Sequence, residues 1–214
     1  METENIKIKT LLIIIASVAI FEGAAVFVSH VLRIAPMSFL LIVRLLEIVT
    51  IILVVATIEG DLLSIGLDSS TIMRGIEKGL LWSAAFGFLT GLVFLILHFT
   101  GINPFALIYT QLPSEKKDLA MFLIVGSIIS TVAEEFFFRG ILYGFFRRWG
   151  ILAALIFTTI IFMLAHYKTG TIPLAQIAGG IIFAASYEIE KNLMVPIIIH
   201  ILGNTAIFVS SMIM

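Results

Sequence analysis

The sequence has no cysteine at all and little charge for its length. Without cysteine, disulfide bonds, thiolate metal sites and a cysteine nucleophile are all excluded. Charged residues fill 13% of the 214 positions, whereas a soluble domain carries about 25%. The net charge of −1 and the lack of a basic run argue against a general nucleic-acid partner.

Apolar residues dominate the chain instead, at 60% of positions and with a mean hydropathy of +1.16. A transmembrane helix needs about 20 mostly apolar residues. Seven segments meet or approach that length: 11–30, 38–58, 80–99, 119–146, 151–167, 173–187 and 193–213. We therefore predict an all-α fold, in which residues 1–214 form a single polytopic transmembrane bundle of about seven to eight spans.

The start of the chain and its loops indicate how the bundle is oriented. Met1–Thr10 leads into a long apolar stretch with further spans behind it, which predicts a retained first span rather than a cleaved signal peptide. With seven spans, one side holds Lys7, Lys9, Arg74, Lys78, Arg147, Arg148 and Lys191, and the other holds Arg33, Lys116, Lys117 and Lys168. The positive-inside rule then predicts that this multi-pass protein has a cytoplasmic N-terminus.

The first two spans carry charges, and the connection after them is the most polar of the chain. Arg44 and Glu47 are three residues apart in the second span, so they share a helix face and favour an ion pair. Glu22 has no partner in its own helix, which leaves either a structural role or a place in a polar cavity. Residues 59–79 predict a short interfacial helix that begins near Asp68.

Three charges within the run 119–146 require a physical reason, because each costs about 2.5–3.5 kcal/mol at a bilayer centre. Glu135 and Arg139 are one helical turn apart and favour an ion pair. Glu134 points about 100° away from Glu135, which leaves it free to face a cavity. The alternative is that the three charges only hold helices together.

Polar groups recur in two later spans. His166 ends the fifth apolar run, one turn after Phe162, and His200 and Asn204 lie one turn apart on one face of the last span. Taken singly, each has a structural explanation as an interfacial or helix-bridging residue. Together with Glu134 they offer what peptide hydrolysis needs, namely a base for water and donors for an oxyanion.

These residues resemble the three motifs of the CPBP intramembrane protease family. That family includes the type II CAAX prenyl endopeptidases and bacteriocin-processing or self-immunity proteins, often labelled abortive-infection proteins. The motifs read Glu134-Glu135-xxx-Arg139 with Gly140 after it, Phe162-xxx-His166 and His200-xxx-Asn204, and the resemblance covers about residues 119–213.

The resemblance implies a membrane bundle of about eight spans, in a prokaryotic cell membrane, with endopeptidase activity in a cavity open to the bilayer. In the family's terms, Glu134 and His166 activate the catalytic water, and His200 and Asn204 form the oxyanion hole. Glu135, Arg139 and Phe162 support the site. The implied partners are membrane lipid and a peptide or prenylated protein substrate, from which a CAAX protease removes a C-terminal tripeptide. An eighth, re-entrant segment would fit between Gly101 and Leu112.

Other readings of the same residues remain open. Glu134, His166 and His200 are also a two-histidine, one-carboxylate set typical of catalytic zinc, although no His-Glu-x-x-His helix is present. We favour water activated by Glu134 without a cofactor and keep zinc as the alternative. The hydroxyls Ser127, Ser130 and Thr131 lie outside any nucleophile elbow, and bonds to their own helix backbone explain them.

Two functions without proteolysis are alternatives to the enzyme. A non-catalytic membrane protein would use the polar cavity to bind a partner or lipid. A proton-coupled transporter would use Glu134 and the histidines as a relay, but the paired repeats and broken helices typical of transporters are not evident. Oligomeric state does not follow from the sequence.

Overall fold

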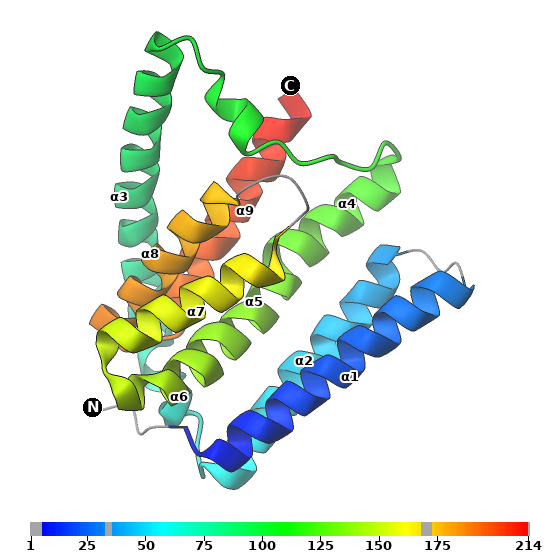
Figure 1. Ribbon diagram of the computed structural model, residues 1–214, viewed down its shortest axis with the longest axis vertical. Coiled ribbons are helices and arrows are strands. Elements are labelled where there is room, and N and C mark those ends of the chain that lie inside the picture. The colour runs from blue at the N-terminus through cyan, green and yellow to red at the C-terminus, as the bar shows by residue number, and fades with distance from the viewer. Residues whose placement is uncertain (1–5, 33–35, 168–172, 214) are drawn as a thin grey trace.

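The computed structural model describes residues 6–32, 36–167 and 173–213, and within these ranges the chain is helical with no strand (Figure 1). The long helices are α1 (Ile8–Leu32), α2 (Pro36–Ile58), α3 (Ile72–Phe99), α7 (Ile151–Ala165), α8 (Leu174–Glu190) and α9 (Met194–Ile213). One further helical segment runs from Lys116 to Trp149. All seven predicted spans are therefore helical.

The segment from Lys116 to Trp149 is a composite that changes its winding several times. It consists of α4 (Lys116–Ile124), η4 (Val125–Ile129), α5 (Ser130–Glu135), η5 (Phe136–Tyr143), α6 (Gly144–Phe146) and η6 (Arg147–Trp149). Both η4 and η5 are π-helical. Such wide turns are rare and often occur at functional sites. Here they flank α5, the short α-helix that ends in the two glutamates.

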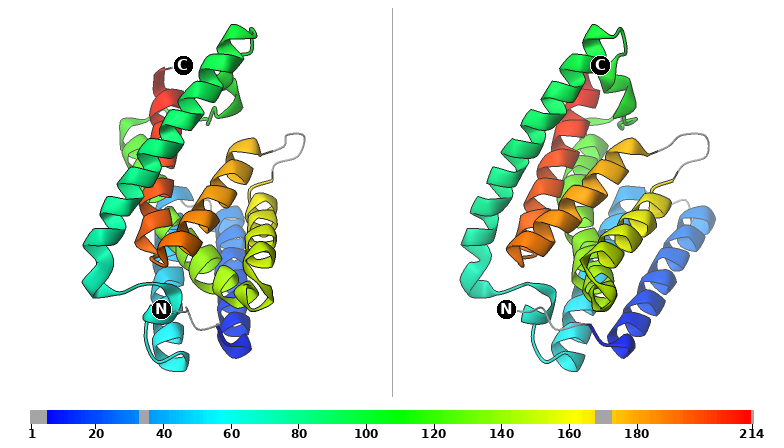
Figure 2. Two further views of the ribbon diagram at one scale, coloured as in Figure 1. Left: turned by 90° about the vertical axis from the view of Figure 1, so that its left-hand side faces the viewer. Right: turned by 60° about the vertical axis from the view of Figure 1, so that its left-hand side comes forward.

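The helices pack as a central group with one helix added on each side. The composite segment packs against α7, α8 and α9, while α1 pairs with α2 and α3 packs along α9. Figure 2 shows α3 standing on one outer side of the bundle and α1 on the other. The buried apolar cluster draws mainly on the composite segment, α7, α8 and α9.

The surface of the bundle is apolar, as expected of a protein embedded in lipid. Five helical segments of the described residues are long and apolar enough to cross a membrane. On α3 large side chains such as Phe88 (71% exposed) and Ile96 (63% exposed) face outward. The chain is thus a multi-pass membrane protein, which confirms the predicted fold class.

Two connections differ in form from the sequence expectations. In place of a separate interfacial helix, residues 59–71 form two single turns, η1 (Leu63–Ile65) and η2 (Ser69–Thr71), and α3 starts directly at Ile72. Asp68 caps η2 by accepting a hydrogen bond from the Ser70 backbone amide. Between Gly101 and Leu112 the only helical element is η3 (Pro104–Leu107), which at four residues is too short to re-enter a membrane.

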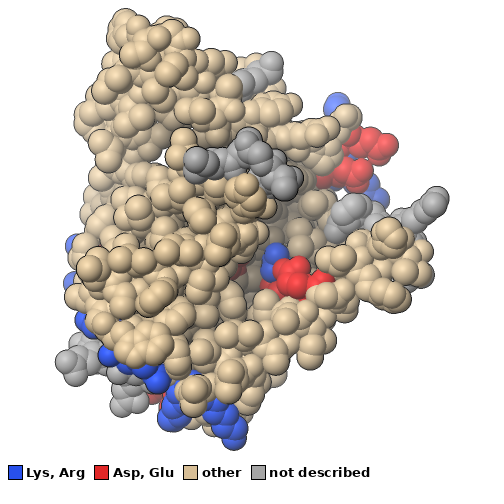
Figure 3. Space-filling view, viewed as in Figure 1, with Lys and Arg blue, Asp and Glu red and all other residues tan. Residues whose placement is uncertain are grey.

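The described basic side chains gather mainly at the ends of the helices. Figure 3 shows Lys and Arg along the lower edge of the molecule and a mixed group of charges at the upper right, with a mostly uncharged face between. This pattern suits a bundle that spans a bilayer. Arg33 and Lys168, which entered the predicted orientation, lie outside the described residues.

Candidate active site

Glu134 and two histidines from other helices meet near the middle of the bundle. Glu134 lies near the end of α5, His166 follows the last residue of α7, and His200 lies in α9. The Oε2 atom of Glu134 is 3.7 Å from Nε2 of His166 and 3.9 Å from Nε2 of His200. These separations are too long for direct hydrogen bonds and short enough for one water molecule to bridge.

Both imidazole rings are held by their other nitrogen. Nδ1 of His166 is 2.9 Å from the carbonyl oxygen of Phe162, and Nδ1 of His200 is 2.7 Å from Oε1 of Glu135. Carbonyl and carboxylate oxygens only accept, so each Nδ1 carries the hydrogen. Each Nε2 is therefore turned toward Glu134, with a lone pair when the ring is neutral.

Glu135 and Arg139 form the ion pair that the spacing predicts. Nη1 of Arg139 donates to Oε1 of Glu135 over 3.0 Å, and both side chains are completely buried. Nη2 of Arg139 also contacts the carbonyl oxygen of Gly180 at 3.4 Å. The bond from His200 to Glu135 was not anticipated, because helical spacing alone does not say which distant side chain a carboxylate will meet.

Aromatic rings enclose this buried pair. The guanidinium carbon of Arg139 lies 4.8 Å from the ring centre of Phe162 and 5.1 Å from that of Phe183. Phe183 also stacks on His200, with ring centres 4.5 Å apart and planes 19° apart. Phe162 thus packs against the buried pair, and its supporting role stays a prediction. Phe183 was missed, because one phenylalanine in an apolar helix carries no distinguishing signal.

Asn204 lies one turn from His200, but its amide is already engaged. Its Nδ2 is 3.2 Å from the hydroxyl of Thr131 and 3.4 Å from the carbonyl oxygen of Gly126. These contacts tie α9 to η4 and α5. They place Asn204 beside the segment that carries Glu134, so all the motif residues singled out in the sequence gather in one region.

The same region of the chain is similar to known proteins. Residues 116–206 match the family model described as type II CAAX prenyl endopeptidase Rce1-like. This match supports the resemblance of segment 116–206 to the CPBP family of intramembrane proteases. The membrane-embedded CAAX protease MroQ of Staphylococcus aureus (strain USA300) is 37% identical over 95 residues, which is 41% of this chain and 38% of MroQ. The chain thus aligns with well under half of that relative's length, and no solved structure matches it.

Two buried hydroxyls in segment 116–206 depart from the sequence interpretation. Ser127 and Ser130 were expected to bond to their own helix backbone, but neither hydroxyl has a hydrogen-bond partner among the described residues. Both are at least nine-tenths buried. Ser127 lies in the π-helical η4, where the carbonyl positions differ from those of an α-helix.

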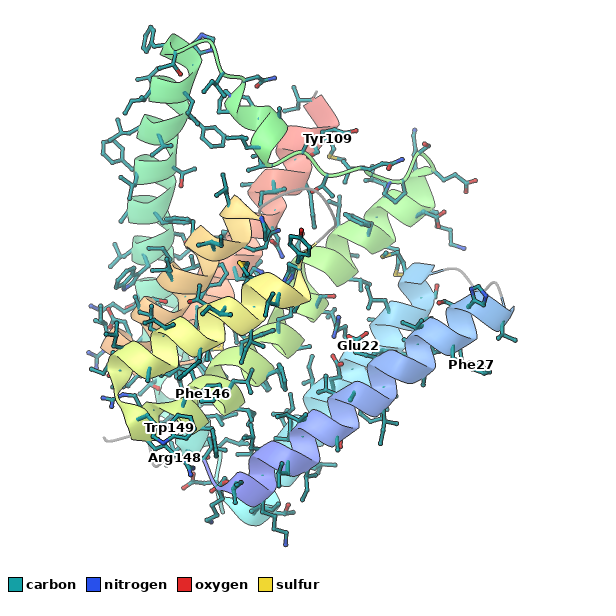
Figure 4. The ribbon with its side chains drawn as sticks, viewed as in Figure 1. Glu22, Phe27, Tyr109, Phe146, Arg148 and Trp149 are labelled. Atoms are coloured by element: carbon teal, nitrogen blue, oxygen red, sulfur yellow. The ribbon has the colours of Figure 1, made fainter. Side chains whose placement is uncertain are left out.

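A second polar cluster lies beside segment 116–206 and involves α1 and α2. Nη1 of Arg44 is 2.6 Å from Oε2 of Glu47, as the sequence predicts, and 2.7 Å from Oε1 of Glu22. The helix that carries Arg44, α2, also packs against α5, which carries Glu134. Figure 4 shows Glu22 on the side of the α1–α2 pair that faces α5, and in the same view Figure 3 shows charged atoms there in a hollow.

The zinc alternative finds limited support in this arrangement. Donation by Nδ1 of a histidine to a carboxylate or carbonyl is also common for metal ligands. However, no three His, Cys, Asp or Glu side chains of the described part of the chain form a group that could hold a metal ion. Glu134, His166 and His200 are near one another but do not form such a group.

Proposed function

We propose that the protein is an intramembrane endopeptidase whose general base is Glu134. The observation that carries this proposal is the approach of two imidazole Nε2 atoms to one carboxylate oxygen, at 3.7 and 3.9 Å. The match of residues 116–206 to the type II CAAX prenyl endopeptidase family model supports the same reaction class.

The orientation of His166 supports a role in holding the catalytic water. With Nδ1–H donated to Phe162, the neutral ring presents an Nε2 lone pair. A water between Glu134 and His166 can give one hydrogen to each, which leaves its own lone pair for the scissile carbonyl carbon. Glu134 takes the proton as the water attacks and passes it to the leaving amine as the C–N bond breaks.

His200 is suited to stabilise the oxyanion in its imidazolium form. Because Nδ1–H is bonded to Glu135, Nε2 can donate only when it too carries a hydrogen. Asn204 is the second donor in this proposal, and its longer contact, at 3.4 Å to Gly126, is the one that a substrate oxygen would replace.

We infer a CAAX-type substrate, a prenylated protein from which a C-terminal tripeptide is removed. The name of the matched family and that of MroQ support this choice of substrate class. An apolar prenyl chain also suits a site enclosed by membrane-spanning helices. We further propose a prokaryotic cell membrane and a cytoplasmic N-terminus, on the excess of basic residues on that side.

The test is cleavage of a farnesylated peptide ending in Cys-Val-Ile-Met by purified protein in lipid nanodiscs. We expect Glu134→Gln to lower kcat/KM at least about 100-fold, since general bases contribute about 10²–10⁴. The matched control is Glu77→Gln, which removes one charge from an exposed position on α3. Cleavage by the Glu134→Gln variant at the wild-type rate would refute the assignment.

The same assay tests the zinc alternative. The Nε2 atoms of His166 and His200, both turned toward Glu134, favour that alternative. Water activated by Glu134 alone predicts that a chelator leaves the rate unchanged. Loss of activity with the chelator, restored by added zinc and accompanied by bound zinc in elemental analysis, would assign Glu134, His166 and His200 as ligands.

A further inference from the structure

Arg44 has one side of its guanidinium group engaged, while the other side has no hydrogen-bond partner among the described residues. Glu22 and Glu47 both bind Nη1, and among the described residues the buried Nε has no hydrogen-bond partner. Nε–H and the adjacent Nη2–H form one edge of the planar group, and that edge is the one that binds a carboxylate through two parallel hydrogen bonds. Arg44 therefore offers a fork for an oxygen ligand inside the membrane.

The position of Arg44 links this fork to the proposed active site. Arg44 lies in α2, which packs against α5, the helix that carries Glu134. Arg139 is completely buried, whereas 19% of the Arg44 side chain is exposed. A ligand from outside would thus reach Arg44 rather than Arg139.

The charges around Arg44 show which carboxylate can be replaced. One guanidinium faces two carboxylates, so a third anion binds favourably only if one of them leaves. Glu47 lies on the same helix as Arg44, and its side chain is 3% exposed. Glu22 comes from α1, and its side chain is 40% exposed. Glu22 is therefore the replaceable partner.

We propose that Arg44 binds the C-terminal carboxylate of a peptide, and that Glu22 occupies this position in the free protein. The inference rests on the proposed function, in which the enzyme removes the last three residues from the C-terminus of its substrate. A tripeptide spans at most about 10 Å. That length suits a carboxylate at Arg44 and a scissile bond at Glu134, because α2 packs directly against α5.

The experiment measures binding without turnover, with valyl-isoleucyl-methionine as the probe. Calorimetry in nanodiscs compares the free acid with its carboxamide. For the wild-type protein we expect the free acid to bind at least about tenfold more tightly, the effect of one lost charge-assisted contact. Equal binding of the two forms, or binding of neither, would overturn the proposal.

Two variants should act in opposite directions, which a purely structural clamp does not predict. Glu22→Gln removes the competing carboxylate, so the free acid should bind several-fold more tightly. Arg44→Gln should reduce the free acid to the level of the carboxamide. Weaker binding of the acid to both variants would identify the cluster as a clamp between α1 and α2 only. Glu77→Gln should change neither affinity.

Two further comparisons test whether the Arg44 variant is folded and whether the recognised carboxylate is the one at the chain end. Arg44→Lys keeps a charge for Glu22 and Glu47 but lacks the fork, so it should lose most of the preference for the acid while its unfolding temperature stays near that of the wild type. A carboxamide peptide with a glutamate side chain should bind weakly, and tight binding would refute recognition of the chain end. Equal binding of acid and carboxamide, beside cleavage that depends on Glu134, would refute this inference alone.

Discussion

The centre of the bundle and its outer helices differ in the interactions that stabilise them within the membrane. At the centre, Glu135 and Arg139 are completely buried and bond to each other, to His200 and to a backbone carbonyl. On the outside, α3 presents large apolar side chains to the surroundings and touches the bundle along α9. The centre therefore depends on every charge keeping its partner, while the outer helices depend on close fit at a few contacts.

Replacing Glu135 should produce the largest loss of stability. Glu135→Ala leaves the Arg139 guanidinium buried without a counter-ion, which typically costs about 3–5 kcal/mol. The matched control is Glu134→Ala, which removes the neighbouring carboxylate. The Glu134 side chain is 18% exposed and makes no direct hydrogen bond to either histidine, so we expect a change of about 1 kcal/mol or less. Unfolding in mixed detergent micelles measures both.

A double variant checks the cause of that loss. Glu135→Leu combined with Arg139→Met removes both charges, and an apolar replacement for a buried pair is often neutral. Stability should recover toward the wild type while activity stays low, because His200 loses the carboxylate that orients it. Equal destabilisation by Glu134→Ala and Glu135→Ala would remove the distinction between the two carboxylates.

The outer region offers a smaller and more local prediction, on α3. A Cβ atom added to Gly79 would lie 2.6 Å from Cβ of Ile198 in α9, whereas one added to Gly91 would meet nothing within 4 Å. We expect Gly79→Ala to destabilise the protein by about 1–3 kcal/mol through overpacking. Gly91→Ala should be neutral or stabilising by up to about 1 kcal/mol. Similar unfolding curves for the two variants would show that α3 does not depend on close contact with α9.

Much of this organisation could be predicted from the sequence because hydropathy and helical spacing are local properties. Long apolar runs gave the helices, and a separation of four residues gave the pair between Glu135 and Arg139. The same spacing left Glu134 without a partner in its own helix, and the structure places it near His166 and His200. The catalytic roles of these residues remain proposals.

The remaining features depend on contacts between helices, which local patterns do not encode. Glu22 finds Arg44 only because α1 and α2 pack side by side, and Phe183 reaches His200 only because α8 lies against α9. The π-helical winding of η4 changes the positions of backbone carbonyls, which an analysis assuming a regular α-helix does not anticipate. Ser127 accordingly lacks the backbone bond that was expected of it.

The smallest expected effect concerns the hydroxyls next to the site. Thr131 accepts a hydrogen bond from Asn204, whereas the neighbouring Ser130 hydroxyl has no partner among the described residues. Thr131→Val removes the acceptor of the Asn204 amide hydrogen bond. We expect the activation free energy to rise by about 1 kcal/mol, which lowers the rate roughly fivefold. If Asn204 serves the oxyanion, the decrease appears in kcat while KM is unchanged. Thr131→Ser should restore the rate, and Ser130→Ala should leave it unchanged. An equal fall in kcat for Ser130→Ala and Thr131→Val would mean that packing, rather than the position of Asn204, sets the rate.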